Sequence, residues 1–214
     1  RKRLISDISH DLKTPISVIS GYIQALYDGK IKSEDLDMYF TTIKNKTEQL
    51  NNLINAFGEY SRLDRSDFLL TLTKTNINEY VRSYFINKYN EIELEDFNLE
   101  VDIPENIENI KIDQFQFNRV LDNLVDNSLK YNLQGTTIFI KVRNEENTTK
   151  IEIADNGLGI SDEIRSNIFS PLTIKMSGKN RQQSSGLGLS ITKKIIDKHG
   201  ATIELIKKSE TKFS

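Results

Sequence analysis

The stretch Ile8-Ser9-His10-Asp11-Leu12-Lys13-Thr14-Pro15 lies near the start of the chain, inside a regular pattern of apolar and ring residues. Their spacing alternates between three and four, a period of about 3.5 that is typical of a helix packed along one seam. The residues of this pattern are Ile5, Ile8, Leu12, Pro15, Ile19, Tyr22 and Leu26. Gly29 ends the pattern, as glycine often does just beyond a helix. The pattern predicts a long amphipathic helix.

A second helix is predicted to follow, with Ser33 as its N-cap and the acidic Glu34 and Asp35 in its first turn. Its apolar stripe comprises Leu36, Phe40, Ile43, Leu50, Ile54 and Phe57. Two helices joined by a short turn form an antiparallel hairpin, which cannot cover both stripes alone. We expect two copies to form a four-helix bundle. The alternative is that the hairpin packs against the rest of its own chain.

His10 is predicted to point away from this seam. With Ile8 as the origin and about 100° per residue, Leu12 lies at about 40° and His10 at about 200°. A histidine in a core would lie on the seam, so the remaining alternative is a solvated surface histidine. An imidazole titrates near neutral pH and is a competent nucleophile.

The neighbours of His10 favour a reactive role. Asp11 is adjacent and can accept the proton on one ring nitrogen while the other attacks. Thr14 lies one turn later on the same face, where its hydroxyl can position a water. Pro15 removes a backbone donor and is expected to bend the helix. Each also has a plain structural interpretation, as a surface charge, a neutral surface residue and a tolerated kink.

The composition narrows the class of protein. The chain has 214 residues, 37% hydrophobic and 28% charged, with a formal net charge of -2 and no cysteine. These values indicate a folded protein without disulfides or thiolate metal sites, and give no sign of a nucleic-acid partner. No apolar run approaches the roughly 20 residues that span a bilayer. Because the sequence begins at Arg1 inside a helical pattern, we expect a fragment of a longer protein.

Composition changes after residue 63, and beyond it strands alternate with helices. Strands are predicted at residues 68–73, 98–103, 110–112, 136–143, 149–154 and 202–206, and helices at 77–89, 115–131, 161–169 and 186–199. Residues 170–185 resemble a loop. This order favours an α+β fold with helices on one face of a mixed sheet. We expect two domains, residues 1–66 and 67–214.

A polar face on the helix at 115–131 indicates a nucleotide site. Asn123, Asn127 and Tyr131 recur every four residues and share a face with Lys130 beside them. Amide oxygens suit a Mg²⁺ ion that already carries phosphates, and a lysine can neutralise phosphate charge. The alternative is an ordinary polar helix face, although asparagine has little helix propensity to explain its recurrence.

Two glycine clusters extend the nucleotide hypothesis. Asp155-Asn156-Gly157-Leu158-Gly159 follows a predicted strand, where glycines allow close approach of the backbone and a buried Asp155 can accept from an adenine amino group. Gly186-Leu187-Gly188-Leu189 opens a helix, and backbone donors there bind phosphate well. The intervening loop is expected to act as a lid, with Lys175, Lys179 and Arg181 near the γ-phosphate. Each cluster is also compatible with a plain turn.

Together these motifs resemble the two-component sensor histidine kinase family over essentially the whole chain. His10–Pro15 is similar to its H box and Asn123–Tyr131 to its N box. Asp155–Gly159 and Gly186–Leu189 are similar to its G1 and G2 boxes. The resemblance implies a dimerising helical hairpin followed by an α/β sandwich of the Bergerat (GHKL) type that binds ATP.

The resemblance also implies roles for individual residues. His10 would be the phosphoacceptor, Asp11 the base, and Thr14 the residue needed to dephosphorylate a response regulator. Asn127 would hold Mg²⁺ and Asp155 the adenine. The remaining implied nucleotide contacts are Asn123, Lys130, Tyr131, Gly157, Gly159, Gly186, Gly188 and Leu189.

The implied protein is a homodimer that transfers phosphate from His10 to an aspartate of a cognate response regulator. Its parent would be anchored in the cell membrane, with this part in the cytoplasm. Two positions depart from the family pattern: Leu172 stands where the F box has a second phenylalanine, and Ala201 where a second glycine is common. Two alternatives stay open: a degenerate member acting as a phosphatase or scaffold, and a Bergerat-type ATPase outside signalling.

Overall fold

The computed structural model describes residues 2–146, 148–172 and 185–206. The chain divides into two compact units, Arg1–Arg65 with Ile168–Ser190 and Ser66–Asn167 with Ile191–Ser214. The domain boundary predicted after residue 66 stays a prediction. The lid cations predicted at Lys175, Lys179 and Arg181 lie outside the described residues. Within the described ranges, no helix combines the length and apolar character needed to cross a bilayer.

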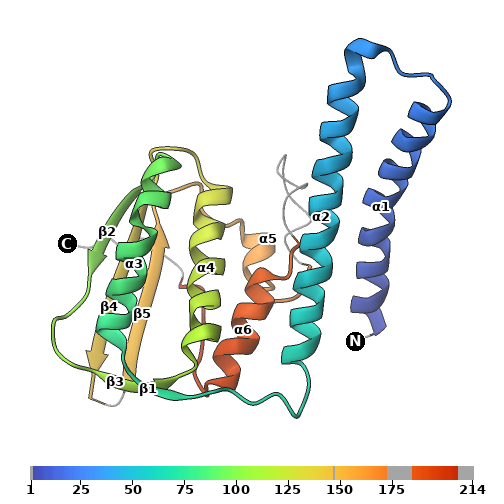
Figure 1. Ribbon diagram of the computed structural model, residues 1–214. Helices are drawn as coiled ribbons and strands as arrows, with labels where there is room; N and C mark the ends of the chain where they lie inside the picture. The colour runs from blue at the N-terminus through green and yellow to red at the C-terminus, as the bar shows by residue number, and fades with distance from the viewer. Residues whose placement is uncertain (1, 147, 173–184, 207–214) are drawn as a thin grey trace. The chain divides into compact units, whose positions relative to one another are not determined.

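The first unit contains the predicted helical hairpin, formed by α1 (Lys2–Tyr27) and α2 (Leu36–Leu63) (Figure 1). Gly29 has a φ of +64° at the end of α1. The backbone N–H of Lys30 donates to Ala25 O at 3.1 Å, and that of Gly29 donates to Leu26 O at 3.1 Å. This pair of bonds is a Schellman motif, so the predicted helix end at Gly29 is confirmed.

The predicted N-cap of the second helix is wrong. Ser33 begins a short 3-10 turn, η1 (Ser33–Asp35), and the residue before α2 is Asp35. Asp35 has φ -98° and ψ -9°, and its side chain makes no capping bond. An N-cap side chain reaches the first free N–H groups from an extended backbone, which Asp35 does not have.

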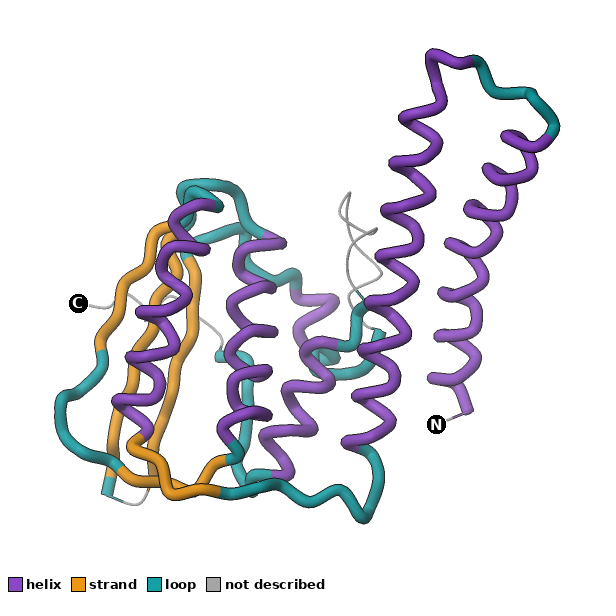
Figure 2. Tube along the Cα trace, in the orientation of Figure 1, coloured by secondary structure: helices purple, strands orange, loops and turns teal. Residues whose placement is uncertain are grey.

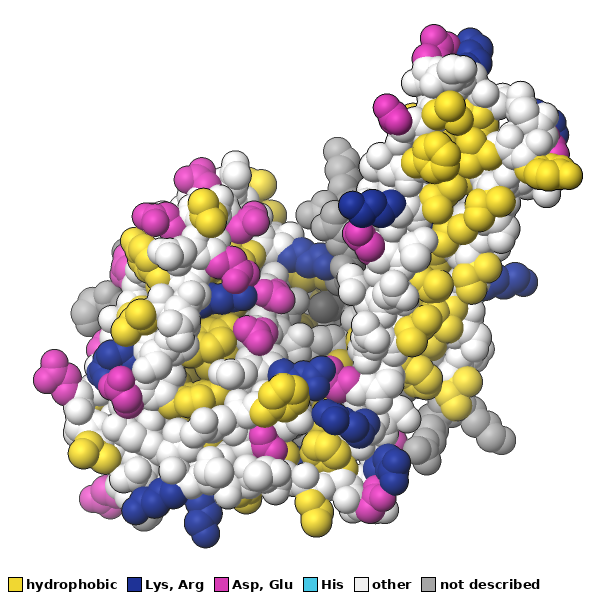
Figure 3. All heavy atoms as spheres, in the orientation of Figure 1, with side chains coloured by type: hydrophobic (Ala, Val, Ile, Leu, Met, Phe, Trp, Pro, Cys, Tyr) yellow, Lys and Arg dark blue, Asp and Glu magenta, His cyan; other side chains and the backbone are white. Residues whose placement is uncertain are grey.

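The hairpin buries only part of its apolar surface. Ile8 and Pro15 are buried on α1, and the rings of Tyr22 and Tyr39 lie 4.6 Å apart between the two helices. Apolar side chains continue along the exposed side of the hairpin (yellow in Figure 3). Those more than a third exposed are Ile5, Ile16, Ile23, Tyr27, Met38, Phe40 and Ile54. Exposed apolar side chains gathered along both helices are typical of a surface that packs against another protein surface.

The second unit contains two sheets. The smaller pairs β1 (Thr73–Asn76) with β3 (Asn109–Ile112) in antiparallel fashion. The larger has the order β2-β4-β5, with β2 (Asn98–Asp102) parallel to β4 (Thr137–Glu145) and β4 antiparallel to β5 (Thr148–Asp155). The helices of this unit are α3 (Ile77–Leu94), α4 (Gln114–Tyr131) and α5 (Asp162–Arg165). Helix α6 (Gly188–Lys198) begins in the first unit and continues into the second at Ile191.

The α+β arrangement predicted from the sequence is confirmed, because α3 and α4 lie on the same face of the mixed sheet (Figures 1 and 2). Strand β4 supplies alternate buried residues, as a strand covered on one face should. The fully buried residues of β4, α3 and α4 are Ile138, Ile140, Val142, Ile77, Val81, Phe85, Ile92, Leu121 and Val125. This core holds α4, with its polar residues, against the sheet.

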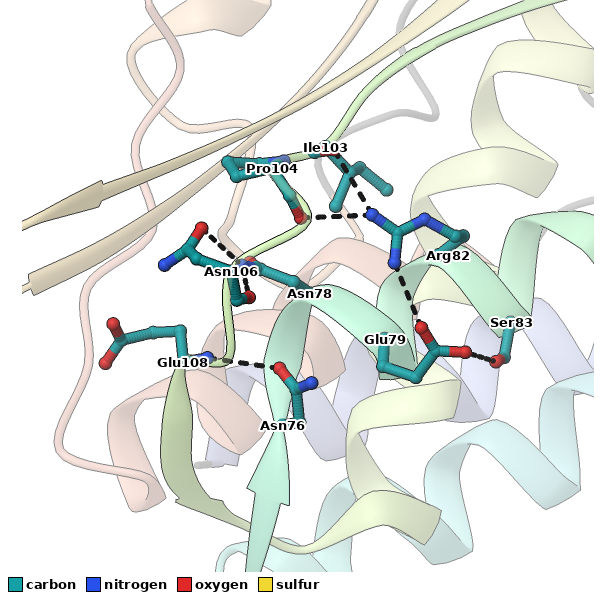
Figure 4. Close-up of polar contacts among 9 residues, drawn as sticks. All are labelled: Asn76, Asn78, Glu79, Arg82, Ser83, Ile103, Pro104, Asn106 and Glu108. Atoms are coloured by element: carbon teal, nitrogen blue, oxygen red, sulfur yellow. Dashed lines mark hydrogen bonds and ion pairs between the residues drawn. The ribbon is translucent and has the colours of Figure 1, made fainter.

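Polar contacts hold the β2–β3 connection against the start of α3 (Figure 4). Arg82 donates to the carbonyls of Ile103 and Pro104 at 3.2 and 3.0 Å. Asn78, which is 1% exposed, donates to Asn106 O at 2.8 Å. Because side chains satisfy these loop carbonyls, the connection is held in one conformation without belonging to a strand.

Three predicted elements differ from the structure. Of the strand predicted at residues 68–73 only Thr73 belongs to β1. Residues 68–72 precede it, and their backbone bonds side chains instead of a strand: Lys198 Nζ donates to Phe68 O, and Thr71 N donates to Asp113 Oδ2. Residues 202–206 alternate in exposure but belong to no strand among the described residues. The helix predicted at 161–169 is limited to α5. A strand requires a partner ladder, which an apolar pattern alone cannot guarantee.

Candidate functional site

His10 is solvent-exposed on α1, as the helical geometry predicts. Its side chain is 83% exposed, whereas Ile8, two residues earlier, is 3% exposed. His10 therefore lies opposite the buried seam and is open to a reaction partner. The helix continues without a break through Pro15, and the bend predicted there stays a prediction.

Asp11 and Thr14 both lie close to His10. The Oδ1 atom of Asp11 is 3.6 Å from Nδ1 of His10, and the Asp11 side chain is 21% exposed. The hydroxyl of Thr14 lies 3.4 Å from the backbone carbonyl of His10. A carboxylate on the Nδ1 side favours the tautomer that leaves Nε2 free to attack. The three predicted residues are thus together on one turn of α1.

The second group of predicted residues lies on α4. The side chain of Asp113 caps this helix by accepting from Gln116 N at 3.0 Å. Half-buried positions on its later turns are Asn123, Asn127, Lys130 and Tyr131. The Nδ2 atom of Asn127 is buried, and no described residue bonds it. Rotating the amide by 180° would place its oxygen there, so Asn127 fits an oxygen-liganded cation.

Burial changes the charge balance on this face of α4. It lowers the pKa of Lys130, and the charge of Asp126 opposes that shift only in part. Burial raises the pKa of Asp126, and Lys88 opposes that shift. A partly desolvated ammonium group gains more from a phosphate than an exposed one would, because less water has to be removed on binding.

Asp155 lies at the end of β5 and faces α4. Its Oδ2 accepts from the hydroxyl of Ser128 at 2.9 Å, and its Oδ1 accepts from Gly157 N at 3.1 Å. Asn132, just after α4, accepts from Leu158 N at 3.0 Å. The fold thus brings the predicted Asp155 cluster to the predicted α4 cluster.

Ser128 and Asn132 were not predicted as site residues. They are four residues apart, so they share a face of α4 that differs from the face of Asn127. The sequence signal available for them was a serine near the end of the predicted helix and an asparagine just after it, since asparagine is common where helices end.

The two glycines of the Asp155 cluster are required for different reasons. A Cβ at Gly157 would lie 1.8 Å from Asn132 Oδ1, whereas a Cβ at Gly159 would meet nothing within 4 Å. Gly159 instead has a φ of +73°. Close approach at Gly157 is therefore to a side chain of the same protein.

The first unit contains the residues of the second predicted glycine cluster, Gly186, Gly188 and Leu189. Gly188 begins α6, and Leu189 is buried. Leu172, where the F box departs from its usual pattern, has a φ of +65° and donates its backbone N–H to Gly186 O at 2.8 Å. A Cβ at Gly186 would lie 3.2 Å from Leu172 Cα, so these two backbones are in close contact.

Two family models match the chain. The "His Kinase A (phospho-acceptor) domain" matches residues 1–66. The "Histidine kinase-, DNA gyrase B-, and HSP90-like ATPase" matches residues 112–214, which identifies an ATP-binding domain of this type. The first match contains the exposed His10, and the second contains α4 and Asp155.

Full-length relatives are longer than this chain. Sensor histidine kinase YcbM of Bacillus subtilis is 31% identical over 206 residues, which are 95% of this chain and 66% of that protein. Sensor histidine kinase WalK of the same organism is 28% identical over 207 residues, 95% of this chain and 34% of that protein.

Solved histidine kinases have the same fold. The structure of histidine kinase ThkA in complex with response regulator TrrA has a TM-score of 0.71 at 25% identity, covering 93% of this chain and 55% of that one. Histidine kinase AdeS of Acinetobacter baumannii has a TM-score of 0.67 at 23% identity, covering 88% and 86%. With a phospho-acceptor hairpin, an ATPase domain and relatives of this kind, the chain belongs to the sensor histidine kinase family.

Proposed function

We propose that this chain is the ATP-dependent catalytic core of a sensor histidine kinase that phosphorylates His10 and passes the phosphoryl group to an aspartate of a response regulator. The observation that carries this proposal is the exposed imidazole of His10 with Asp11 Oδ1 at 3.6 Å from its Nδ1. Exposure lets a nucleotide and a partner protein reach the same ring in turn.

The chemistry follows from this arrangement. Nε2 of His10 attacks the γ-phosphorus of ATP, a nitrogen–phosphorus bond forms, and the bond to the β–γ bridging oxygen breaks. The bond's electron pair leaves with ADP, and Asp11 holds the proton on Nδ1 as positive charge develops on the ring. Positioning and charge stabilisation dominate this type of transfer, so the residues that orient ATP carry most of the rate.

The nucleotide would be held by the α4 cluster and the loop after β5. Asp155 would accept from the adenine amino group, and Lys130 would neutralise phosphate charge. The buried Nδ2 of Asn127, which no described residue bonds, supports a Mg²⁺ ligand at that position once the amide is turned over. Asn127 would hold the ion beside the phosphates, where Mg²⁺ would supply neutralisation of the charge that develops on them. The implied phosphate contacts from Gly186, Gly188 and Leu189 stay part of this proposal.

The proposed assembly is a homodimer. The apolar arc left exposed along α1 and α2, which includes Ile16, Ile23 and Phe40, supports pairing of two hairpins into a four-helix bundle. The proposed partner is a response regulator, which is supported by the solved complex of ThkA with TrrA. We place the chain on the cytoplasmic side of a membrane-anchored parent because ATP is available there.

A second function is supported by Thr14 and Leu172. Thr14 lies on the turn of His10, where its hydroxyl can orient a water for removal of phosphate from the regulator. Leu172 replaces an aromatic residue of the F box, which favours a slower kinase. A phosphatase-dominant member would bind ATP and accumulate little phosphohistidine, and its phosphatase activity would be lost in Thr14→Ala.

The main test uses labelled ATP. We expect an acid-labile label on the wild-type chain and none on His10→Gln, with unchanged ATP affinity in both. Label that persists in His10→Gln would refute His10 as the phosphoacceptor, and ATP hydrolysis insensitive to His10 would favour an ATPase outside signalling. Asn127→Ala should weaken Mg-ATP binding, and unchanged affinity would refute the metal assignment.

A further inference from the structure

Two polar side chains at the end of α4 face the end of β5 and the loop that follows it: Ser128 lies on the last turn of α4, and Asn132 follows the helix directly. The hydroxyl of Ser128 donates to Asp155 Oδ2 at 2.9 Å, and Asn132 Oδ1 accepts from Leu158 N at 3.0 Å. Ser128 is 7% exposed. The helix therefore contacts the loop at two points, one on the carboxylate and one on the backbone three residues later.

Asn132 is fixed in orientation by a second bond. Its Nδ2 donates to Ser128 O at 3.0 Å, which satisfies a carbonyl at the end of α4 that lacks a helical partner. Turning the amide over would place Nδ2 against the N–H of Leu158 and Oδ1 against the carbonyl of Ser128. Both contacts would then be unfavourable, so the amide has one good orientation.

Gly157 leaves the space that Asn132 occupies. A Cβ on Gly157 would lie 1.8 Å from Asn132 Oδ1 and 2.1 Å from its Cγ. The backbone of Gly157 is not in the left-handed region, so an alanine there would collide with the Asn132 side chain and would not be strained by its own φ.

Asp155 keeps acceptor capacity after these bonds. Among the described residues, each of its two oxygens accepts one bond, from Ser128 and from Gly157 N. A carboxylate has about four acceptor positions, so roughly two stay available for a ligand. The direction in which they point is set by the two bonds already made.

We propose that Ser128 and Asn132 are positioning residues that orient the Asp155 carboxylate and the Asp155–Leu158 loop toward the adenine amino group. This inference rests on the proposed role of Asp155 in adenine binding. It predicts that both residues affect recognition of the amino group more than binding of the phosphates.

The first experiment measures dissociation constants by calorimetry for Mg-ATP and for purine riboside triphosphate, which lacks the amino group. Asn132→Ala and Ser128→Ala are each expected to weaken ATP binding about 5- to 10-fold, the value of one hydrogen bond. Binding of purine riboside triphosphate should change less than about twofold. Ser128→Thr retains the hydroxyl and should restore most of the ATP preference.

The second experiment is a double-mutant cycle. Gly157→Ala must displace the Asn132 side chain, so it should weaken ATP binding about as much as Asn132→Ala does. The double variant should then be no worse than either single variant, because the displaced contact is already lost. Additive losses would overturn the proposed coupling. If Asn132→Ala fails to fold, Asn132→Ser, whose shorter side chain also loses the contact with Leu158 N, provides the same cycle.

Two controls separate the possible failures. Asn90→Ala changes an exposed asparagine on α3 and should alter no constant. Asp155→Asn tests the underlying proposal: if it leaves ATP affinity unchanged, the adenine role of Asp155 is wrong. If Asp155→Asn weakens ATP binding while Ser128→Ala and Asn132→Ala weaken both nucleotides equally, only the positioning role is wrong.

Discussion

His199 is the second of the two histidines, and it is integrated into the fold of the second unit. Its Nδ1 lies 2.8 Å from Ile195 O, and its Nε2 accepts from Asp113 N at 3.0 Å. A backbone N–H can only donate, so Nε2 must be the acceptor and Nδ1 carries the hydrogen. His199 thus connects the end of α6 to the residue that caps α4.

Replacing His199 with alanine should destabilise this unit by about 2–4 kcal/mol. The N–H of Asp113, a residue 8% exposed, would lose its acceptor. A buried unsatisfied donor costs about 1–3 kcal/mol. The imidazole also contacts the Phe117 ring edge-on, with centroids 6.2 Å apart, and such a contact is worth about 0.5–1.5 kcal/mol. For a domain of this size we expect Tm to fall by roughly 5–12 °C.

The assay is thermal unfolding followed by circular dichroism at pH 7.5, with His10→Ala as the matched control. His10 is exposed and bonds no buried donor in the part of the chain that the structure describes, so its replacement should change stability by less than about 0.5 kcal/mol. If His199→Ala lowers Tm no more than His10→Ala does, the bridge from α6 to α4 contributes nothing and the reasoning is wrong. His199→Asn, which can still accept from Asp113 N, should recover part of the loss.

Three further predictions concern the second unit. Partial desolvation raises the pKa of Asp126 above its usual 3.8, so its ionised form costs stability. Because Asp126 is also exposed and solvent screens its charge, Asp126→Asn should raise Tm only slightly at pH 7, and this gain should vanish as pH falls toward 4. A lower Tm at pH 7 would instead mean that attraction to Lys88 outweighs burial. Arg82→Lys should lower the urea midpoint, with a loss of about 1–2 kcal/mol in the free energy of unfolding. A single ammonium group cannot reach Glu79 and two loop carbonyls together as the planar guanidinium does. An unchanged midpoint would show that the β2–β3 connection does not need the guanidinium group. Tyr84→Phe should destabilise by about 1 kcal/mol, measured in the same titration, since the Tyr84 hydroxyl donates to Asp122 at 2.7 Å; no change would mean that water replaces this bond at no cost.

Local patterns in the sequence predicted the elements best where one residue type determines the geometry. The first helix of the hairpin ends just before Gly29, and α4 begins one residue before its predicted start. The prediction of a strand at residues 202–206 was wrong, because these described residues form no strand although they alternate in exposure. Strand formation depends on a partner distant in sequence, and no local pattern reports whether that partner is present.

The sequence by itself determined the family, the exposure of His10 and the polar face of α4 that includes Asn127. These follow from periodicity and residue type, which act within a few turns of the chain. Tertiary structure alone decided that Ser128 and Asn132 contact the loop of Asp155, and that Gly157 is a glycine because Asn132 fills its space. Contacts between α4 and that loop join residues 26 and 27 positions apart. Only the packing of α4 on the sheet brings them within hydrogen-bonding distance.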